Sequence, residues 1–160
     1  MYYEAPDAVV LIDPLVPPED DERFRTALDR DVERLGRPVH VLVTVFWHAR
    51  SAGELVGRYG GLLGEPPQEG VDAVPSGRAG EVLFWIPEHG ALVAGDVIVG
   101  AEGGGLRLCP ESWLPAGSGH AELRTALRPL LALPVERVLV SHGEPLLEGG
   151  HAALEQLLAT

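Results

Sequence analysis

The sequence contains only one cysteine, Cys109, in 160 residues. A single cysteine excludes an intramolecular disulfide framework and any zinc site built from several thiolates. Basic side chains are also scarce, because 12 lysine and arginine residues stand against 24 aspartate and glutamate residues, which gives a formal net charge of −12. This balance argues against nucleic acid or an anionic membrane surface as the main partner. We interpret the acidity as a source of solubility.

No apolar run in the chain approaches the length of a membrane span. The first ten residues, MYYEAPDAVV, lack the basic start and the long apolar segment of a signal peptide, so we expect a cytoplasmic protein. The proportions of apolar (46%) and charged (22%) residues are typical of a globular protein. A chain of this length fits one domain, and we interpret residues 1–160 as a single domain.

Residues 39–55, VHVLVTVFWHARSAGEL, combine a predicted strand with a predicted helix start. The apolar run 39–46 is rich in valine, which favours a strand buried on both faces. Ser51 and Glu54 have the spacing of a capping box, with Ser51 as the N-cap. A strand that leads directly into a helix places His48 and Arg50 at the carboxyl edge of a sheet, where α/β proteins build sites.

The remaining pattern alternates short strands with helices. The acidic run 19–22 opens a helix with one apolar stripe (Phe24, Leu28, Val32 and Leu35), which ends at Gly36. Residues 60–80 are rich in glycine and proline and predict an irregular connection with at most one short strand. Further strands are expected at 2–4, 8–12, 81–86, 91–93, 97–99 and 137–140, and further helices at 121–133 and 152–158.

The order of motifs resembles that of the metallo-β-lactamase-fold hydrolases. In that family a buried strand ends in T-H-x-H-x-D-H-x-G-G, which aligns here on Thr44 and Gly53. Four further family elements occur in the order that the family has: an early strand ending in an aspartate before this motif, and a P-G-H-T-P-G segment, a G-D element and a G-H-G element after it, at residues 9–14, 75–80, 94–96 and 141–143. The resemblance covers nearly the whole chain and implies an α/β (α+β) fold, a four-layer αββα sandwich shortened at its N-terminus.

The resemblance also implies that most metal ligands have been replaced. Members of the family hold two zinc ions with five histidines and two aspartates, and a bridging hydroxide attacks an ester, thioester, amide or phosphodiester. The replaced ligand positions fall on Val45, Trp47, Ala49, Arg50 and Gly77. Only the bridging aspartate, Asp96, and the last histidine, His142, remain. We therefore expect an eroded dinuclear site without zinc hydrolase activity and without a cofactor.

The arginine at one of these positions suggests how such a site stays neutral. Arg50 is always protonated and has no lone pair for a metal, but its guanidinium can give two hydrogen bonds to a carboxylate. We hypothesise that Arg50 supplies the positive charge that a metal supplies elsewhere, and that it neutralises Asp96. Asp96, His142 and Arg50 are then the predicted residues of a charged pocket that binds a small-molecule ligand or a partner.

A second hypothesis keeps hydrolase activity on an ester or thioester. His48 lies one position out of register with the metal-binding frame, and a local backbone shift would group His48, Asp96 and His142 around a single metal such as zinc. Without a metal, His142 would be a general base oriented by Asp96, with Arg50 as an anion clamp. The simpler interpretation is that His48 is a polar residue at a strand end that hydrogen-bonds to a neighbour.

The other candidate side chains have simpler interpretations. His40, His89 and His151 are expected on the surface, and His120 lies at a helix start. Cys109 is expected in the core. No G-x-S-x-G elbow is present, so a serine hydrolase has no support.

The early part of the chain also predicts contact with a second chain. The family normally has further strands before the one that ends at Asp13, and here few residues precede it. A missing strand exposes a sheet edge, which must be covered by pairing, twisting or charge. We therefore expect a homodimer or a sheet edge in contact with another chain.

Overall fold

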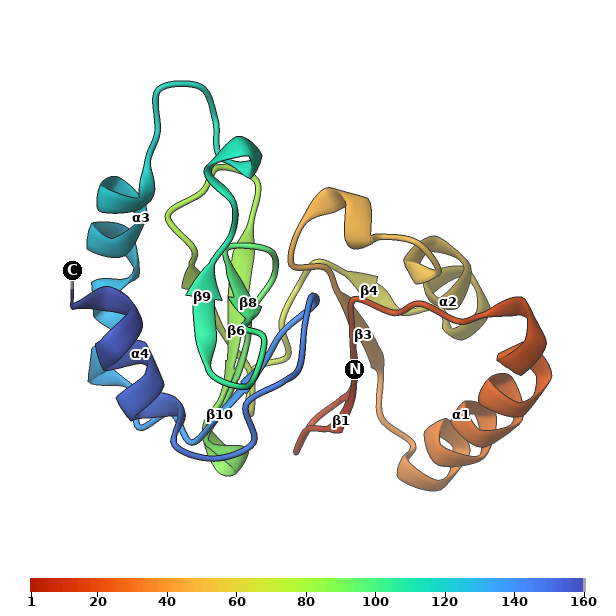
Figure 1. Cartoon of the computed structure of the whole chain (residues 1–160). Coiled ribbons are helices and arrows are strands. Elements are labelled where there is room, and N and C mark those ends of the chain that lie inside the picture. Colours follow the sequence, from red (N-terminus) through yellow and green to blue (C-terminus); the bar gives the residue numbers. More distant parts are fainter. Residues whose placement is uncertain (160) are drawn as a thin grey trace. The chain divides into compact units, whose positions relative to one another are not determined.

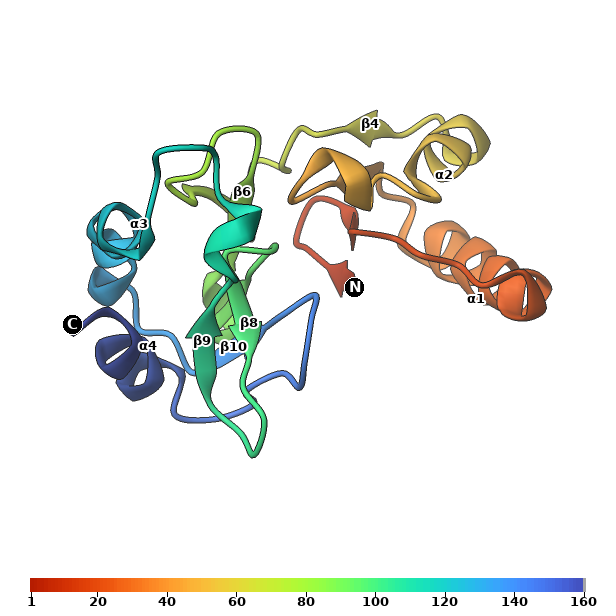
Figure 2. The same ribbon diagram turned by 45° about the horizontal axis from the view of Figure 1, so that its top comes forward.

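A computed structural model of the chain describes residues 1–159 and contains two compact units, Met1–Val71 and Asp72–Thr160. Each unit has one four-stranded sheet with helices packed against it (Figures 1 and 2). The mixture of sheets and helices confirms the predicted α/β (α+β) class. The single-domain interpretation and the four-layer packing stay predictions.

The first unit contains a mostly parallel sheet with the strand order β1-β2-β3-β4. Strand β1 pairs antiparallel with β2, and the other two pairings are parallel. Two α-helices follow β2 and β3 in the chain. The elements are β1 (Tyr2–Glu4), β2 (Val9–Ile12), α1 (Asp21–Leu35), β3 (Val39–Leu42), α2 (Ala52–Tyr59) and β4 (Leu62–Leu63).

The apolar stripe of α1 packs as predicted. Leu28 is the fully buried residue of this helix, and the other stripe residues are partly buried against the same core. The helix ends at Gly36, whose left-handed conformation (φ 61°) lets its amide donate to the Val32 carbonyl at 2.9 Å. Ala52 and Leu55 of α2 complete this core. Both helices therefore bury their apolar faces on β2 and β3.

The chain leaves β3 earlier than the apolar run predicts. The strand ends at Leu42, and Phe46–His48 forms a 3₁₀ turn. Ser51 precedes α2 as expected, but its hydroxyl accepts a hydrogen bond from the Val16 amide at 3.1 Å and does not cap the helix. Glu54 pairs with Arg25 of α1. The capping-box prediction is therefore wrong, because both side chains bond to other elements.

The glycine- and proline-rich connection contains two short strands, whereas the pattern allowed at most one. Leu62–Leu63 forms β4, and Asp72–Pro75 forms β5. Both strands lie at a sheet edge and bury few side chains, so their sequences lack the alternation that marks a strand.

The second unit contains a sheet with the strand order β10-β7-β6-β5 and a separate two-stranded hairpin, β8–β9. The predicted hairpin of β6 and β7 is confirmed, and β10 runs parallel to β7. Helices α3 and α4 cover one face of the sheet (Figure 1). The elements are β6 (Val82–Ile86), β7 (Ala91–Val93), β8 (Ile98–Gly100), β9 (Leu106–Leu108), α3 (His120–Leu127), β10 (Arg137–Leu139) and α4 (Gly150–Leu158).

One large apolar core joins these elements. It includes Leu83 of β6 and Leu92 of β7, together with leucines from α3 and α4. The helix predicted at 121–133 ends at Leu127 and continues as a 3₁₀ turn, because Pro129 has no amide hydrogen to extend an α-helix. Strand β9 was not predicted, since only three residues separate the glycine-rich loop before it from Cys109 and Pro110 after it.

Two other expectations concern the surroundings of the protein. Within residues 1–159, no helix combines the length and the apolar character that crossing a bilayer requires. Strands β1 and β4 form the two edges of the first sheet. The homodimer stays a prediction.

Candidate functional site

In the first unit, the aspartate that follows β2 organises the loop after β3. Asp13 Oδ1 accepts a hydrogen bond from the Thr44 amide at 2.8 Å, and Oδ2 accepts one from the Thr44 hydroxyl at 2.5 Å. Asp13 holds a left-handed backbone conformation (φ 48°), which is uncommon outside glycine. The two hydrogen bonds to Thr44 offset this backbone strain, and they link the ends of the neighbouring parallel strands β2 and β3.

The same carboxylate holds the imidazole of His48. Its Nδ1 lies 3.0 Å from Asp13 Oδ2 and 3.1 Å from the Thr44 hydroxyl, and the ring is buried. Because a carboxylate only accepts, Nδ1 carries a proton that is directed at Asp13. His48 therefore hydrogen-bonds to its neighbours, although it lies in the 3₁₀ turn after β3 and not at a strand end. The bond to Asp13 also gives the ring the orientation that a carboxylate imposes on a metal-binding or basic histidine.

In the second unit, the structure brings together Asp96 and His142, the two retained residues of the motif. Asp96 lies between β7 and β8 and is buried, whereas the His142 side chain, in the loop after β10, is 47% exposed. His142 Nε2 lies 3.3 Å from Asp96 Oδ1. The pair combines a buried carboxylate with an accessible imidazole.

Two glycines allow the His142 loop to lie directly on β8. The Gly100 amide donates to the His142 carbonyl at 2.8 Å. A Cβ atom on Gly100 would lie 2.4 Å from the Glu144 carbonyl oxygen, and one on Gly143 would lie 2.7 Å from the Gly100 carbonyl oxygen. Backbone contact at this distance requires glycine at both positions.

An aromatic side chain borders the imidazole. The Trp113 ring lies edge-on to the His142 ring, with centroids 5.3 Å apart and an interplanar angle of 65°. Trp113 belongs to the 3₁₀ turn Glu111–Trp113, and the Cys109 amide just before that turn donates to the Val97 carbonyl. The turn is thus anchored beside the residue that follows Asp96.

A buried glutamate fixes the backbone at Asp96. Glu81 Oε1 accepts hydrogen bonds from the amides of Asp96 at 2.6 Å and Val97 at 2.9 Å, and Oε2 pairs with Arg78 Nη1 at 3.2 Å. Burial raises the pKa of Glu81, while the two amides and Arg78 oppose that rise. Sequence reasoning missed Glu81, although a carboxylate directly before the apolar run of β6 was a visible signal.

The raised pKa of Glu81 predicts a pH dependence of stability. At pH values between its ordinary pKa of 4.5 and its raised folded pKa, Glu81 binds a proton in the folded state that it has released in the unfolded state. The stabilisation that this proton provides is fully present below the ordinary pKa and is lost as the pH rises through the folded pKa, above which Glu81 is ionised in both states. Glu81→Gln does not titrate, so the free energy of unfolding of the wild type minus that of the variant should fall as the pH rises toward neutrality. Denaturant unfolding across this range measures the difference, and a flat difference would contradict the prediction.

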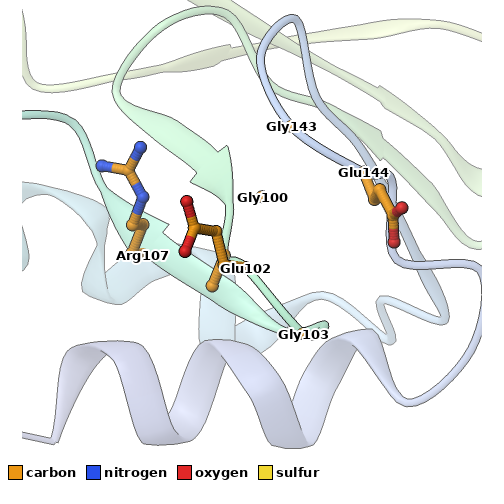
Figure 3. A pocket seen from close by; sticks show the side chains of 7 residues that line it. Gly100, Glu102, Gly103, Arg107, Gly143 and Glu144 are labelled. Atoms are coloured by element: carbon orange, nitrogen blue, oxygen red, sulfur yellow. The ribbon is translucent and has the colours of Figure 1, made fainter.

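A pocket of about 680 Å³ lies next to the His142 loop within the second unit. Figure 3 shows Glu102 and Arg107 side by side on one wall, with Glu144 on the other. Glycine backbone from Gly100, Gly103 and Gly143 forms much of the remaining lining. The pocket therefore presents charged groups and exposed backbone, which suit a small polar ligand better than an apolar one.

The other residues considered from the sequence occupy varied surroundings. The Arg50 side chain is exposed and takes no part in the hydrogen bonds around Asp13, so its site role stays a prediction. His40 was expected on the surface but is buried within β3, where its Nδ1 is satisfied by the Glu65 carbonyl at 2.7 Å. His120 Nε2 bonds to the Cys109 carbonyl at 2.8 Å.

Three further residues are placed as follows. His89 is exposed, as predicted, and His151 is half-buried, with Nδ1 3.2 Å from the Leu133 carbonyl. Cys109 lies in the core as predicted, and burial raises the pKa of its thiol.

The position of one replaced histidine is closed by packing. Gly77 has a left-handed conformation (φ +80°), and a Cβ atom on it would lie 2.3 Å from the Cβ of Ala126 in α3. Val45, at another replaced position, is buried in the first unit. A side chain at position 77 therefore requires α3 to move.

Comparisons with known proteins rest on structure. No family model matches the sequence, and no curated protein matches it. The structure is similar to VMB-1 (TM-score 0.58, 12% identity, 99% of this chain and 81% of that one) and to the B3 metallo-β-lactamase BLEG-1 (0.58, 18%, 89% and 85%). It is also similar to TTHA1623 in a di-iron-bound form (0.53, 22%, 98% and 90%). Because these likenesses extend over nearly the whole chain, the protein has the metallo-β-lactamase fold.

Proposed function

We propose that this metallo-β-lactamase-fold protein lacks a dinuclear zinc centre and uses a charged pocket around Asp96 and His142 of the second unit to bind a small-molecule ligand or a partner. The observation that carries the proposal is the packing at Gly77. The family places a histidine ligand at this position, and here α3 occupies the space that its Cβ would need. The packing of α3 against Gly77 in the second unit therefore excludes a histidine ligand at this position.

The donor set supports the same conclusion. Of the family's seven ligand positions, five carry valine, tryptophan, alanine, arginine and glycine in this chain. None of these side chains donates a lone pair of the kind that zinc binds in proteins. The residues present therefore do not fit two metal ions, and no chemical step is assigned to such a centre.

The retained pair still offers recognition chemistry. The buried Asp96 carboxylate lies 3.3 Å from His142 Nε2, which is close enough for an ion pair when the imidazole is protonated. The half-exposed imidazole can also donate a hydrogen bond to a ligand or accept one from it. The Trp113 ring beside it supplies an apolar edge. A ligand with a polar group next to a flat apolar part matches these neighbours.

A second candidate function, hydrolysis of an ester or thioester, is favoured by the orientation of His48. Asp13 holds the proton on His48 Nδ1, which is the arrangement that carboxylates impose on metal-binding histidines. One metal held by His48, Asp96 and His142 would supply a water of lowered pKa. Two imidazoles and one carboxylate fit a single ion in number and type.

Metal content and hydrolysis together test these two candidates. Protein purified without chelators is examined by elemental mass spectrometry, titrated with Zn²⁺ in a calorimeter, and assayed with 4-nitrophenyl acetate and an acyl thioester. The proposed function expects substoichiometric metal, no saturable Zn²⁺ binding and no turnover above that of His142→Ala. Stoichiometric metal that is lost in both His48→Ala and His142→Ala would instead establish the single-metal hydrolase.

A further inference from the structure

The second unit buries two carboxylates and one guanidinium close together. The Glu81 side chain is fully buried, and the Arg78 side chain is 11% exposed. Glu81 Oε1 accepts hydrogen bonds from the backbone amides of Asp96 at 2.6 Å and Val97 at 2.9 Å, so it lies directly beside the Asp96 backbone. Arg78, Glu81 and Asp96 thus form one cluster, which we call the Arg78 cluster.

We infer that Arg78 is the fixed cation that takes the place of a metal ion in this unit, and that Glu81 couples it to Asp96 by holding the Asp96 backbone. The inference rests on the proposed function, in which no metal occupies the site. It assigns to Arg78 the role that the sequence hypothesis gave to Arg50. Arg78 and Glu81 are therefore positioning residues.

Electrostatics supplies the first argument. Two carboxylates in a buried cluster repel each other, and removing them from water carries a further cost. A guanidinium offsets both effects, since it stays charged at every physiological pH and forms directional hydrogen bonds to carboxylates. Arg78 makes this contact at 3.2 Å from a nearly buried position, whereas Arg50 is exposed.

The local backbone supplies the second argument. The Ser76 hydroxyl accepts a hydrogen bond from the Arg78 amide at 3.0 Å and donates one to the Glu81 carbonyl at 2.9 Å. Ser76 is itself buried, so this turn is fixed at both ends. Arg78 directly follows Gly77, where the family carries a metal ligand. The segment that loses a ligand therefore gains a cation at the next residue.

Thermal unfolding with and without ZnCl₂ tests the inference. Arg78→Ala leaves the buried carboxylates without their cation and is expected to lower Tm by roughly 10 °C, while the matched control Arg50→Ala changes Tm little. Zn²⁺ should raise the Tm of Arg78→Ala and recover part of the loss, because the ion then neutralises the carboxylates. Zn²⁺ should leave the wild type and Arg50→Ala unchanged. Arg78→Lys keeps the charge and is expected to lose less than Arg78→Ala and to show no response to Zn²⁺.

The outcomes separate the inference from the function on which it rests. A Zn²⁺-dependent rise in the Tm of the wild type overturns the proposed function. If Zn²⁺ changes neither the Tm of the wild type nor the Tm of Arg78→Ala, the inference is overturned and the proposed function stands. If Arg78→Ala does not fold, the neutral double variant Arg78→Met/Glu81→Gln is compared with Arg78→Met. A higher Tm for the double variant supports charge compensation, and an equal or lower Tm overturns it.

Discussion

Replacing Gly77 with histidine, the residue of the family motif, is expected to lower the free energy of unfolding by roughly 4 kcal/mol and to create no metal site. Two costs add. A residue other than glycine at φ +80° is strained by about 1 to 3 kcal/mol, and forcing a side chain into packed space costs about 1 to 3 kcal/mol. Denaturant unfolding of the variant and the wild type measures the loss.

Gly80 provides a matched control in the same segment. It has nearly the same conformation (φ +79°), but a Cβ on it meets no atom within 4 Å. Gly80→His should therefore show the conformational cost alone. The clash itself is tested by Gly77→Ala with and without Ala126→Gly, because the second change removes the atom that lies 2.3 Å away. Equal losses in the Gly77→His and Gly80→His variants would show that packing by α3 does not close position 77.

Removing the carboxylate at Asp13 is expected to cost roughly 3 kcal/mol of unfolding free energy and to release His48. Asp13→Ala deletes the acceptor for the Thr44 amide, the Thr44 hydroxyl and His48 Nδ1. Hydrogen bonds to a charged group contribute about 1.5 to 3 kcal/mol each, and bonds that share one acceptor group do not add fully. The substitution does not relieve backbone strain at position 13, because alanine adopts the left-handed conformation less readily than aspartate does.

Nitrogen NMR of the His48 ring reports the specific part of this effect. In the wild type the ring should carry its proton on Nδ1, and in Asp13→Ala it should show mixed tautomers. Thr44→Val is the matched control, because it removes the hydroxyl but leaves the carboxylate beside His48 in place. This variant is expected to lose stability while keeping the Nδ1 tautomer. A tautomer that is unchanged in Asp13→Ala would refute the assignment of Asp13 as the group that orients His48.

The sequence was most informative where a local pattern and the tertiary environment agree. The stripe of α1, the stop at Gly36 and the hairpin of β6 and β7 were all predicted, because periodicity and turn chemistry specify them locally. The capping box at Ser51 failed for the opposite reason. Its two side chains found partners at Val16 and Arg25, which are distant in sequence, and local spacing carries no information about such contacts.

The candidate site divides in the same way. The motif order led to Asp96 and His142, which the structure places 3.3 Å apart. The residues that hold them, Glu81 and Gly100, were not recognised. Glu81 acts through backbone amides 15 and 16 residues away, and Gly100 acts through a backbone contact with the His142 loop. Both roles depend on how strands are joined in three dimensions, which a single sequence does not record.

The backbone contact between Gly100 and the loop after β10 also constrains how this protein can evolve. No side chain separates the two segments, so main-chain atoms alone set the distance between β8 and the backbone at His142. Point mutations elsewhere can alter what the imidazole contacts, but they cannot easily move the backbone that carries it. Among relatives, we expect a side chain at position 100 only where the loop at 143 and 144 has changed length, so that the two sites covary as a pair.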